Sequence, residues 1–397
     1  MGRTRHATYF LGICSAGIAL LMIIYPETAV RASFQGLQMW WENVFPALFP
    51  FFVLTELMIG FGVVTFAGVL LEPVMRPVFR VPGIGGFVFM MGLVSGYPAG
   101  ARMTAQLYKE QKLTKSEAER LSSFTNFSNP LFLFSVTAVQ FFHQASLGIV
   151  FALAHYFGNI GVGLIMRAYK PLPFQKKRTH SHFSLFARAL RSMHSERMIR
   201  YEPLGKMLGD AVISSVRTLL VIGGFIMLFS MLYQLFRETG TVTWIGSITG
   251  PLFELAGLTP ELGQALLPGI FEMTIGVHEV AVTGAPVLER VIVGSALLGF
   301  CGFSIQAQTV SILSQAGLSA KPFLIGRLIH AILSGIAAFL FYHMLHIGEK
   351  MTGPSAVPAT AGSPVYSEIQ LGPIMTASVL ILFILILLKR MQSGRHQ

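Results

Sequence analysis

The chain has 397 residues, of which 53% are hydrophobic and only 12% are charged, whereas soluble domains carry about 25% charged residues. A net charge of +11 would suggest nucleic-acid binding in a soluble protein, but membrane proteins collect lysine and arginine in their cytoplasmic loops. Cys14 and Cys301 both lie in apolar segments, so neither a disulfide framework nor a cysteine metal site is indicated. The composition predicts an integral membrane protein and excludes nucleic acid as its partner.

Long apolar runs predict spanning helices at about 8–26, 44–71, 120–142, 147–168, 207–236, 289–314, 322–345 and 372–388. The first run follows Arg3 and Arg5 as a signal peptide would, but residues 25–28 make a poor cleavage site, so this helix is expected to be retained. With both termini in the cytoplasm, 23 lysines and arginines lie on the inner side and 4 on the outer side. This bias agrees with the positive-inside rule.

Two further apolar segments, 83–100 and 261–286, are interrupted by Gly, Pro and polar residues. Segment 83–100 has basic residues on both flanks, so a single crossing would leave one basic flank outside. Both segments are therefore predicted to enter the membrane and turn back, from opposite sides. The predicted fold class is an all-α integral membrane protein with about eight transmembrane helices plus two oppositely oriented re-entrant hairpins in an inverted repeat.

The repeat predicts five parts of the chain. They are an N-terminal helix and outer loop (1–43), a first repeat (44–168), a basic cytoplasmic linker (169–206), a second repeat (207–345), and an outer loop, C-terminal helix and basic tail (346–397). Part of the linker is expected either to lie on anionic lipid as an amphipathic helix or to be a solvated connection.

Interrupted segments at matching places in two halves are typical of a transporter's substrate site. Pro130 forces a helix break in the first half, although a capped structural kink would give the same pattern. Exposed backbone groups and neutral polar side chains at such breaks suit a polar ligand. The predicted substrate-binding residues are Ser95, Gly96, Tyr97, Arg102, Thr125, Asn126, Ser128, Asn129, Glu272, Thr274, His278, Glu279, Ser304 and Gln306.

Ionisable residues at membrane depth are costly and suggest function. Glu272, His278 and Glu279 could bind substrate, carry a coupling proton, or form an internal structural pair. No second histidine stands four residues from His278, so no metal site is predicted. Arg217 needs a partner or an aqueous cavity. Glu56 of the related helix is the hypothesised partner, and snorkelling toward the inner face is the alternative.

Three other polar residues on apolar helices, His155, Arg327 and His330, are interpreted as packing residues. The chain has no nucleophile elbow, no HExxH sequence and no phosphate-binding glycine loop. It is therefore predicted not to be an enzyme or an ATP-driven pump, with no catalytic residue and no cofactor.

Four segments together resemble a known family: Ser95–Met103 (SGYPAGARM), Thr125–Pro130 (TNFSNP), and the later GIFEMTIGVHE and GFCGFSIQAQ. They resemble the YlbJ-type sporulation integral membrane proteins, also called stage V sporulation protein V, which carry the nucleoside-recognition Gate domain. The resemblance covers almost the whole chain and implies that both repeats are Gate-type. The plan of hairpins and broken helices is also similar to that of concentrative nucleoside transporters, in architecture only.

The resemblance implies secondary transport of a small organic anion, dipicolinic acid, from the mother cell across the outer forespore membrane. Arg102, Arg217 and His278 could then meet its carboxylates. A nucleoside transporter and a non-transporting membrane scaffold are the alternatives. The expected partners are the anionic solute and membrane lipids. A coupling proton or sodium ion, a homo-oligomer, and location in the cell membrane are left open.

Overall fold

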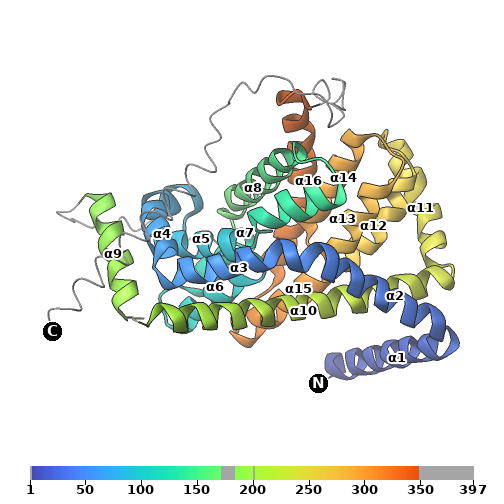
Figure 1. Cartoon of the computed structure of the whole chain (residues 1–397), viewed down its shortest axis with the longest axis horizontal. Coiled ribbons are helices and arrows are strands. Elements are labelled where there is room, and N and C mark those ends of the chain that lie inside the picture. Colours follow the sequence, from blue (N-terminus) through green and yellow to red (C-terminus); the bar gives the residue numbers. More distant parts are fainter. Residues whose placement is uncertain (1, 171–183, 200–201, 348–397) are drawn as a thin grey trace, which may run out of the picture. The chain divides into compact units, whose positions relative to one another are not determined.

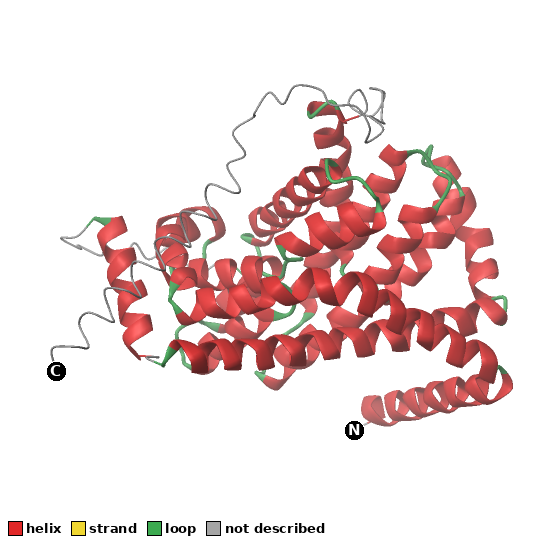
Figure 2. Cartoon of the chain, in the orientation of Figure 1, coloured by secondary structure: helices red, strands yellow, loops and turns green. Residues whose placement is uncertain are grey.

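The computed structural model describes residues 2–170, 184–199 and 202–347, with side chains from residue 8 onward. Every regular element in this part of the chain is helical (Figure 2). The α-helices are α1 (Gly2–Ile24), α2 (Pro26–Met39), α3 (Phe45–Gly60), α4 (Val63–Val74), α5 (Gly85–Ser95), α6 (Ala99–Lys109), α7 (Lys115–Phe124), α8 (Leu147–Met166), α9 (Leu185–Ile199), α10 (Leu204–Glu238), α11 (Thr241–Leu255), α12 (Glu261–Phe271), α13 (Met273–Val282), α14 (Val287–Phe300), α15 (Gly302–Gln315) and α16 (Lys321–Met344). Three π-helical segments are η1 (Trp40–Val44), η2 (Met75–Phe79) and η3 (Phe132–Phe141).

The same order of elements occurs twice. Helices α2, η1 and α3 form one continuous helix, Pro26–Gly60, of 35 residues, and α10 also has 35 residues. Each ends at a turn with a left-handed glycine, Gly62 or Gly240, which begins the short helix α4 or α11. A helix pair follows, α5–α6 or α12–α13, then a broken helix, α7–η3 or α14–α15, and finally α8 or α16. The structure therefore contains the internal repeat that the sequence predicts.

The two 35-residue helices lie side by side and point in opposite directions (Figure 1). Thr28 at the start of the first helix donates a hydrogen bond of 3.3 Å to Glu238 at the end of α10. Glu56 near the end of the first helix accepts one of 2.7 Å from Ser214 near the start of α10. Because equivalent helices run antiparallel, the repeat is inverted, as expected from the sequence.

Small residues allow these helices to approach closely. A Cβ atom added to Gly36 would lie 2.9 Å from the Cβ of Ser230, and one added to Gly223 would lie 2.7 Å from the Trp40 ring. Close backbone approach at glycine and other small residues is how helices associate in membranes, where lipid tails weaken the hydrophobic driving force.

Five helices of the described part are long and apolar enough to cross a membrane: Pro26–Gly60, Leu147–Met166, Leu204–Glu238, Val287–Gln315 and Lys321–Met344. The predicted bounds 44–71 are wrong, because the helix begins at Pro26 and stops before Gly62. The outer loop expected before residue 44 is helical. Its polar side chains lowered the apparent hydropathy, but its buried face consists of Ala29, Ala32 and Gly36. The span predicted at 372–388 lies outside the described residues.

Each predicted hairpin is a pair of helices joined by a short turn. Residues 96–98 join α5 to α6, and Glu272 joins α12 to α13. That the pairs enter a membrane and turn back stays a prediction.

Part of the basic linker forms α9, which packs on α4. The Phe186 and Phe66 rings meet edge to face at 5.6 Å, and Arg188 forms an ion pair with Glu72. Several apolar side chains of α9 remain exposed, including Leu190 and Ile199. Part of the linker is therefore a helix packed on α4, and both the lipid-surface position and the solvated connection stay predictions.

A buried carboxylate fastens α7 to two other parts of the chain. Glu119 accepts hydrogen bonds from the Ser319 amide at 3.0 Å, the Tyr169 hydroxyl at 2.9 Å and the Lys170 ammonium at 3.3 Å. Burial opposes ionisation of Glu119, but these three donors outweigh it and lower the pKa of the carboxyl group. This contact holds in place the helix that leads into the first break.

Candidate functional site

Each helix-pair turn packs on the break in the broken helix of its own half. A Cβ atom added to Gly92 or Gly100 would lie 1.8 or 2.0 Å from the Thr125 carbonyl oxygen, so only glycine permits this approach. In the second half, a Cβ atom on Gly302 would lie 2.9 Å from the Met273 nitrogen. Each turn is therefore held close to the break of its own half.

The first break spans residues 125–129, which have no regular structure. The Asn126 side chain accepts a hydrogen bond from the Ala101 amide (3.1 Å) and donates one to the Ser122 carbonyl (2.8 Å). Thr125 donates its hydroxyl to the Leu121 carbonyl (2.9 Å). Side chains thus replace the missing helical hydrogen bonds, as buried backbone requires.

The second break is shorter. Cys301 and Gly302 both have left-handed backbone angles, φ 63° and 69°, which separate α14 from α15. The Gln306 side chain donates a hydrogen bond of 2.9 Å to the Phe300 carbonyl, which has lost its helical partner. Gln306 therefore caps the break.

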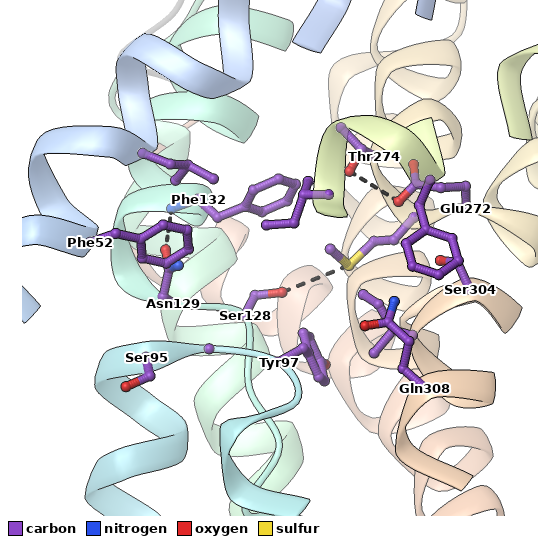
Figure 3. A pocket seen from close by; sticks show the side chains of 16 residues that line it. Phe52, Ser95, Tyr97, Ser128, Asn129, Phe132, Glu272, Thr274, Ser304 and Gln308 are labelled. Carbon is purple, nitrogen blue, oxygen red and sulfur yellow. Dashed lines mark hydrogen bonds between the residues drawn. The ribbon is translucent and has the colours of Figure 1, made fainter. Parts of the chain in front are cut away.

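A cavity of about 90 Å³ lies where the turns and breaks meet (Figure 3). The apolar part of the lining consists of aromatic and aliphatic side chains, including Phe52, Phe132 and Phe225. The polar lining residues are Ser95, Gly96, Tyr97, Ser128, Asn129, Glu272, Thr274, Ser304 and Gln308. Within the described chain, the buried Ser95 hydroxyl has no hydrogen-bond partner, so it is available to a ligand.

Glu272 is a buried carboxylate in this cavity, with 4% of its surface exposed. It begins α13, where its side chain accepts the Ile275 amide at 2.9 Å and the Thr274 hydroxyl at 3.2 Å. Negative charge is favourable at a helix N-terminus. These contacts fix the direction of the carboxylate and leave it in the wall of the cavity (Figure 3).

A second cavity of about 380 Å³ adjoins the first, and Phe52, Ser95 and Tyr97 line both. Its other polar residues include Arg102 and Glu56. The predicted site residue Arg102 is therefore in this neighbouring space and not in the central cavity.

Five other predicted site residues, Thr125, Asn126, His278, Glu279 and Gln306, lie away from the cavity lining. His278 and Glu279 face each other at 3.7 Å, each about one third exposed, and the His278 ring packs edge-on against Phe141. Gln306, like Thr125 and Asn126, supports a break. These placements agree with the internal pairing and capped-kink alternatives.

The hypothesised pair of Arg217 with Glu56 is wrong. Glu56 instead accepts the Ser214 hydroxyl, whereas Arg217 is exposed beside Val212, Val216 and other apolar residues of α10. One helical turn separates Ser214 from Arg217, but only Ser214 faces α3. An exposed Arg217 agrees with the snorkelling alternative.

The sequence predicts a packing role for His155, Arg327 and His330, and in the structure these residues form a hydrogen-bonded group behind Tyr97. Arg327 is fully buried and donates to the Tyr97 hydroxyl (3.3 Å), and Tyr97 in turn lines the cavity. His330 accepts from Arg327 at Nδ1 (3.0 Å), and its Nε2 donates to the His155 carbonyl (2.8 Å). The general rule that intramembrane ionisable residues suggest function would have selected Arg327.

His155 also accepts the Ser128 amide at Nε2 (2.9 Å), so this nitrogen carries no proton. Both histidines are therefore neutral in this arrangement, since each uses one ring nitrogen as an acceptor. In the residues that the structure describes, no group of three His, Cys, Asp or Glu side chains could hold a metal ion.

A family model described as Gate, nucleoside recognition, matches residues 41–145, which contain the first turn and the first break. The sporulation integral membrane protein YlbJ of Bacillus subtilis (strain 168) is 43% identical over 398 residues, covering 98% of this chain and 96% of that protein. The chain belongs to the YlbJ family of sporulation integral membrane proteins.

Two other proteins are similar to this YlbJ-family chain. An uncharacterized protein of Alkalihalophilus pseudofirmus is 30% identical over 120 residues, which cover 30% of this chain and 26% of that protein. A solved structure of a CNTnw variant in an intermediate state has a TM-score of 0.49 and 13% identity, covering 89% of this chain and 87% of that one.

Proposed function

We propose that this membrane protein is a secondary transporter of a small organic anion, with dipicolinic acid as its foremost solute. The observation that carries the proposal is the central cavity, which lies where two helix breaks and two helix-pair turns of an inverted repeat meet. Substrate sites of secondary transporters are typically formed by discontinuous helices at a repeat interface.

The lining of the cavity supports a flat, polar solute. Phe52, Phe132 and Phe225 supply apolar surface for an aromatic ring. Ser128, Asn129 and the other neutral polar groups supply hydrogen bonds to carboxylate oxygens or a ring nitrogen. The buried guanidinium of Arg327, one hydrogen bond behind Tyr97, adds positive potential that favours an anion.

Membership of a sporulation family supports the outer forespore membrane as the location, with transport out of the mother cell. The distribution of lysine and arginine supports cytoplasmic termini. The second cavity, joined to the first at Phe52, Ser95 and Tyr97, would then be the space through which the solute reaches the central cavity.

The test is uptake of dipicolinate into proteoliposomes containing the purified protein. Saturable uptake is expected, with at least about tenfold loss in a Ser128→Ala, Gln308→Leu double variant, because two hydrogen-bonding groups of the lining disappear. Gln315→Leu is the matched control, since Gln315 is exposed on the same helix α15 as Gln308. Equal loss in the control, or no uptake by folded wild type under proton and sodium gradients, would contradict the proposal.

A second candidate solute is a nucleoside. Glu272 in the cavity wall could accept hydrogen bonds from sugar hydroxyls, whereas a carboxylate repels a dianion at close range. Uridine uptake that Glu272→Gln reduces would favour this candidate. Dipicolinate uptake that the same variant leaves unchanged or increases would favour the anion. Uptake of neither solute would favour the scaffold alternative.

A further inference from the structure

Arg327 is a buried positive charge, and no carboxylate of the described residues accepts its hydrogen bonds. Its side chain is fully buried, and an arginine side chain stays protonated in proteins. Among the described residues, none of the groups that accept its hydrogen bonds is acidic. An isolated buried charge is very costly, so dipoles must compensate it.

The compensating dipoles belong to the first helix break. Arg327 donates to the Ser123 carbonyl (2.7 Å) and to the Asn126 carbonyl (3.2 Å), on either side of the point where α7 unwinds. It also donates to the Asn159 side-chain oxygen (2.9 Å), while the Asn159 amide nitrogen donates to the Phe124 and Asn126 carbonyls. The C-terminal end of α7 carries partial negative charge and favours a cation.

This group of oxygens has the chemistry of a site for a small monovalent cation. In secondary transporters, carbonyls of unwound backbone and half-helix C-terminal ends coordinate the coupling sodium ion. The guanidinium does not fill the hydrogen-bonding geometry completely, because the buried Nε–H of Arg327 has no partner in the described chain. The oxygens therefore compensate the positive charge of Arg327 but do not accept all of its hydrogen bonds.

We propose that Arg327 is a built-in cation, held at the helix break where a sodium-coupled transporter would bind a sodium ion. Its positive charge is permanent and belongs to a side chain of α16. The carbonyl groups of the break are therefore stabilised without an ion from solution. This inference rests on the proposed transport function, and it predicts that the protein takes up its solute without sodium. The second break has no such charge, because the neutral Gln306 amide caps it.

The first test is thermal unfolding of the full-length protein in detergent, in sodium chloride or choline chloride of equal ionic strength. Wild type is expected to unfold at the same temperature in both salts, within about 1 °C. Arg327→Ala is expected to unfold earlier in choline chloride and to regain about 3 °C or more, saturably, with sodium or with about 10 mM guanidinium. Saturable stabilisation of wild type by sodium would overturn the proposal.

Arg290→Ala is the matched control, because Arg290 also donates to a helix carbonyl, that of Ala281 (2.6 Å), but is only partly buried. It is expected to show no difference between sodium and choline. Arg327→Lys, which keeps the charge, is expected to fold and to be indifferent to sodium, and it serves if Arg327→Ala does not fold. Sodium stabilisation of the lysine variant, or an alanine variant that folds but responds to neither cation, would contradict the proposal.

Dipicolinate uptake by wild type is expected to be unchanged when choline replaces sodium, whereas Arg327→Ala is expected to require sodium. Sodium-dependent uptake by wild type would overturn the proposal that Arg327 takes the place of a sodium ion. Absence of any uptake would contradict the proposed function and leave the unfolding results as the test of Arg327.

Discussion

The contact between the first turn and the first break makes a strong prediction for Gly100→Ala and Gly92→Ala. Added Cβ atoms would lie 2.0 and 1.8 Å from the Thr125 carbonyl oxygen, well inside the 3.0 Å that real Cβ atoms keep. The obstacle is backbone and not the end of a flexible side chain, so α5 or α6 must move by about 1 Å. That movement would separate the turn from the break and deform the cavity.

Overpacking of a well-packed core costs about 1–3 kcal/mol, and a backbone obstacle places these variants at about 3 kcal/mol or above. A loss of 1 kcal/mol lowers the unfolding temperature by about 2–4 °C in a domain of 150–250 residues. Each variant should therefore unfold roughly 6–12 °C earlier than wild type.

Gly224→Ala is the control, because a Cβ atom on Gly224 in α10 would meet nothing within 4 Å. It is expected to be neutral or slightly stabilising, since alanine is the better helix former. Thermal unfolding of the three purified variants, with solute uptake measured alongside, gives the comparison. Gly100→Ala unfolding within about 1 °C of wild type would refute the reasoning, because the turn would not then press on the break.

Three further substitutions test the supports of the site. The three donors around Glu119 outweigh burial and lower its pKa. Its stabilisation is therefore present above the unfolded pKa of about 4.3 and lost as pH falls through the lower folded value. Unfolding temperatures measured from neutral to acidic pH should show Glu119→Gln losing less stability below pH 4.3 than wild type; parallel curves would contradict this. Asn126→Leu should cost about 3 kcal/mol or more, since it leaves two buried backbone groups unpaired. Loss of uptake at unchanged unfolding temperature would instead place Asn126 in solute binding. Gln306→Leu should cost about 1–3 kcal/mol through the unpaired Phe300 carbonyl, and an unfolding temperature equal to that of wild type would show that another group caps the break.

The breaks and turns were predictable from the sequence because their causes are local. Pro130 prevents a continuous helix, Asn126 and Asn129 before it favour backbone capping, and the glycines of segment 83–100 mark sites of close approach. The repeat was predictable for the same reason, since these local interruptions recur in the same order. The helix at residues 27–43 was missed because hydropathy averages over its exposed polar side and its small-residue side, which packs on α10.

The roles of individual side chains were less predictable, since they depend on partners far along the chain. Asn126 supports the break through Ala101, and Arg327 meets carbonyls about two hundred positions away. Nothing in the sequence near Arg327 specifies that its partners would be neutral oxygens. Similarly, Glu272 and His278 stand close together in the sequence, but only Glu272 lines the cavity.

The antiparallel pair of 35-residue helices has the character of an interface between two copies of one protein, because equivalent segments face each other across an approximate two-fold axis. A true homodimer would have to place identical side chains at both of its breaks. Fusion into one polypeptide removes that constraint, so one break holds an arginine and the other a glutamine. Duplication followed by divergence would thus have let the two sides of a symmetric framework take up different chemistry, one fixed and charged, the other neutral.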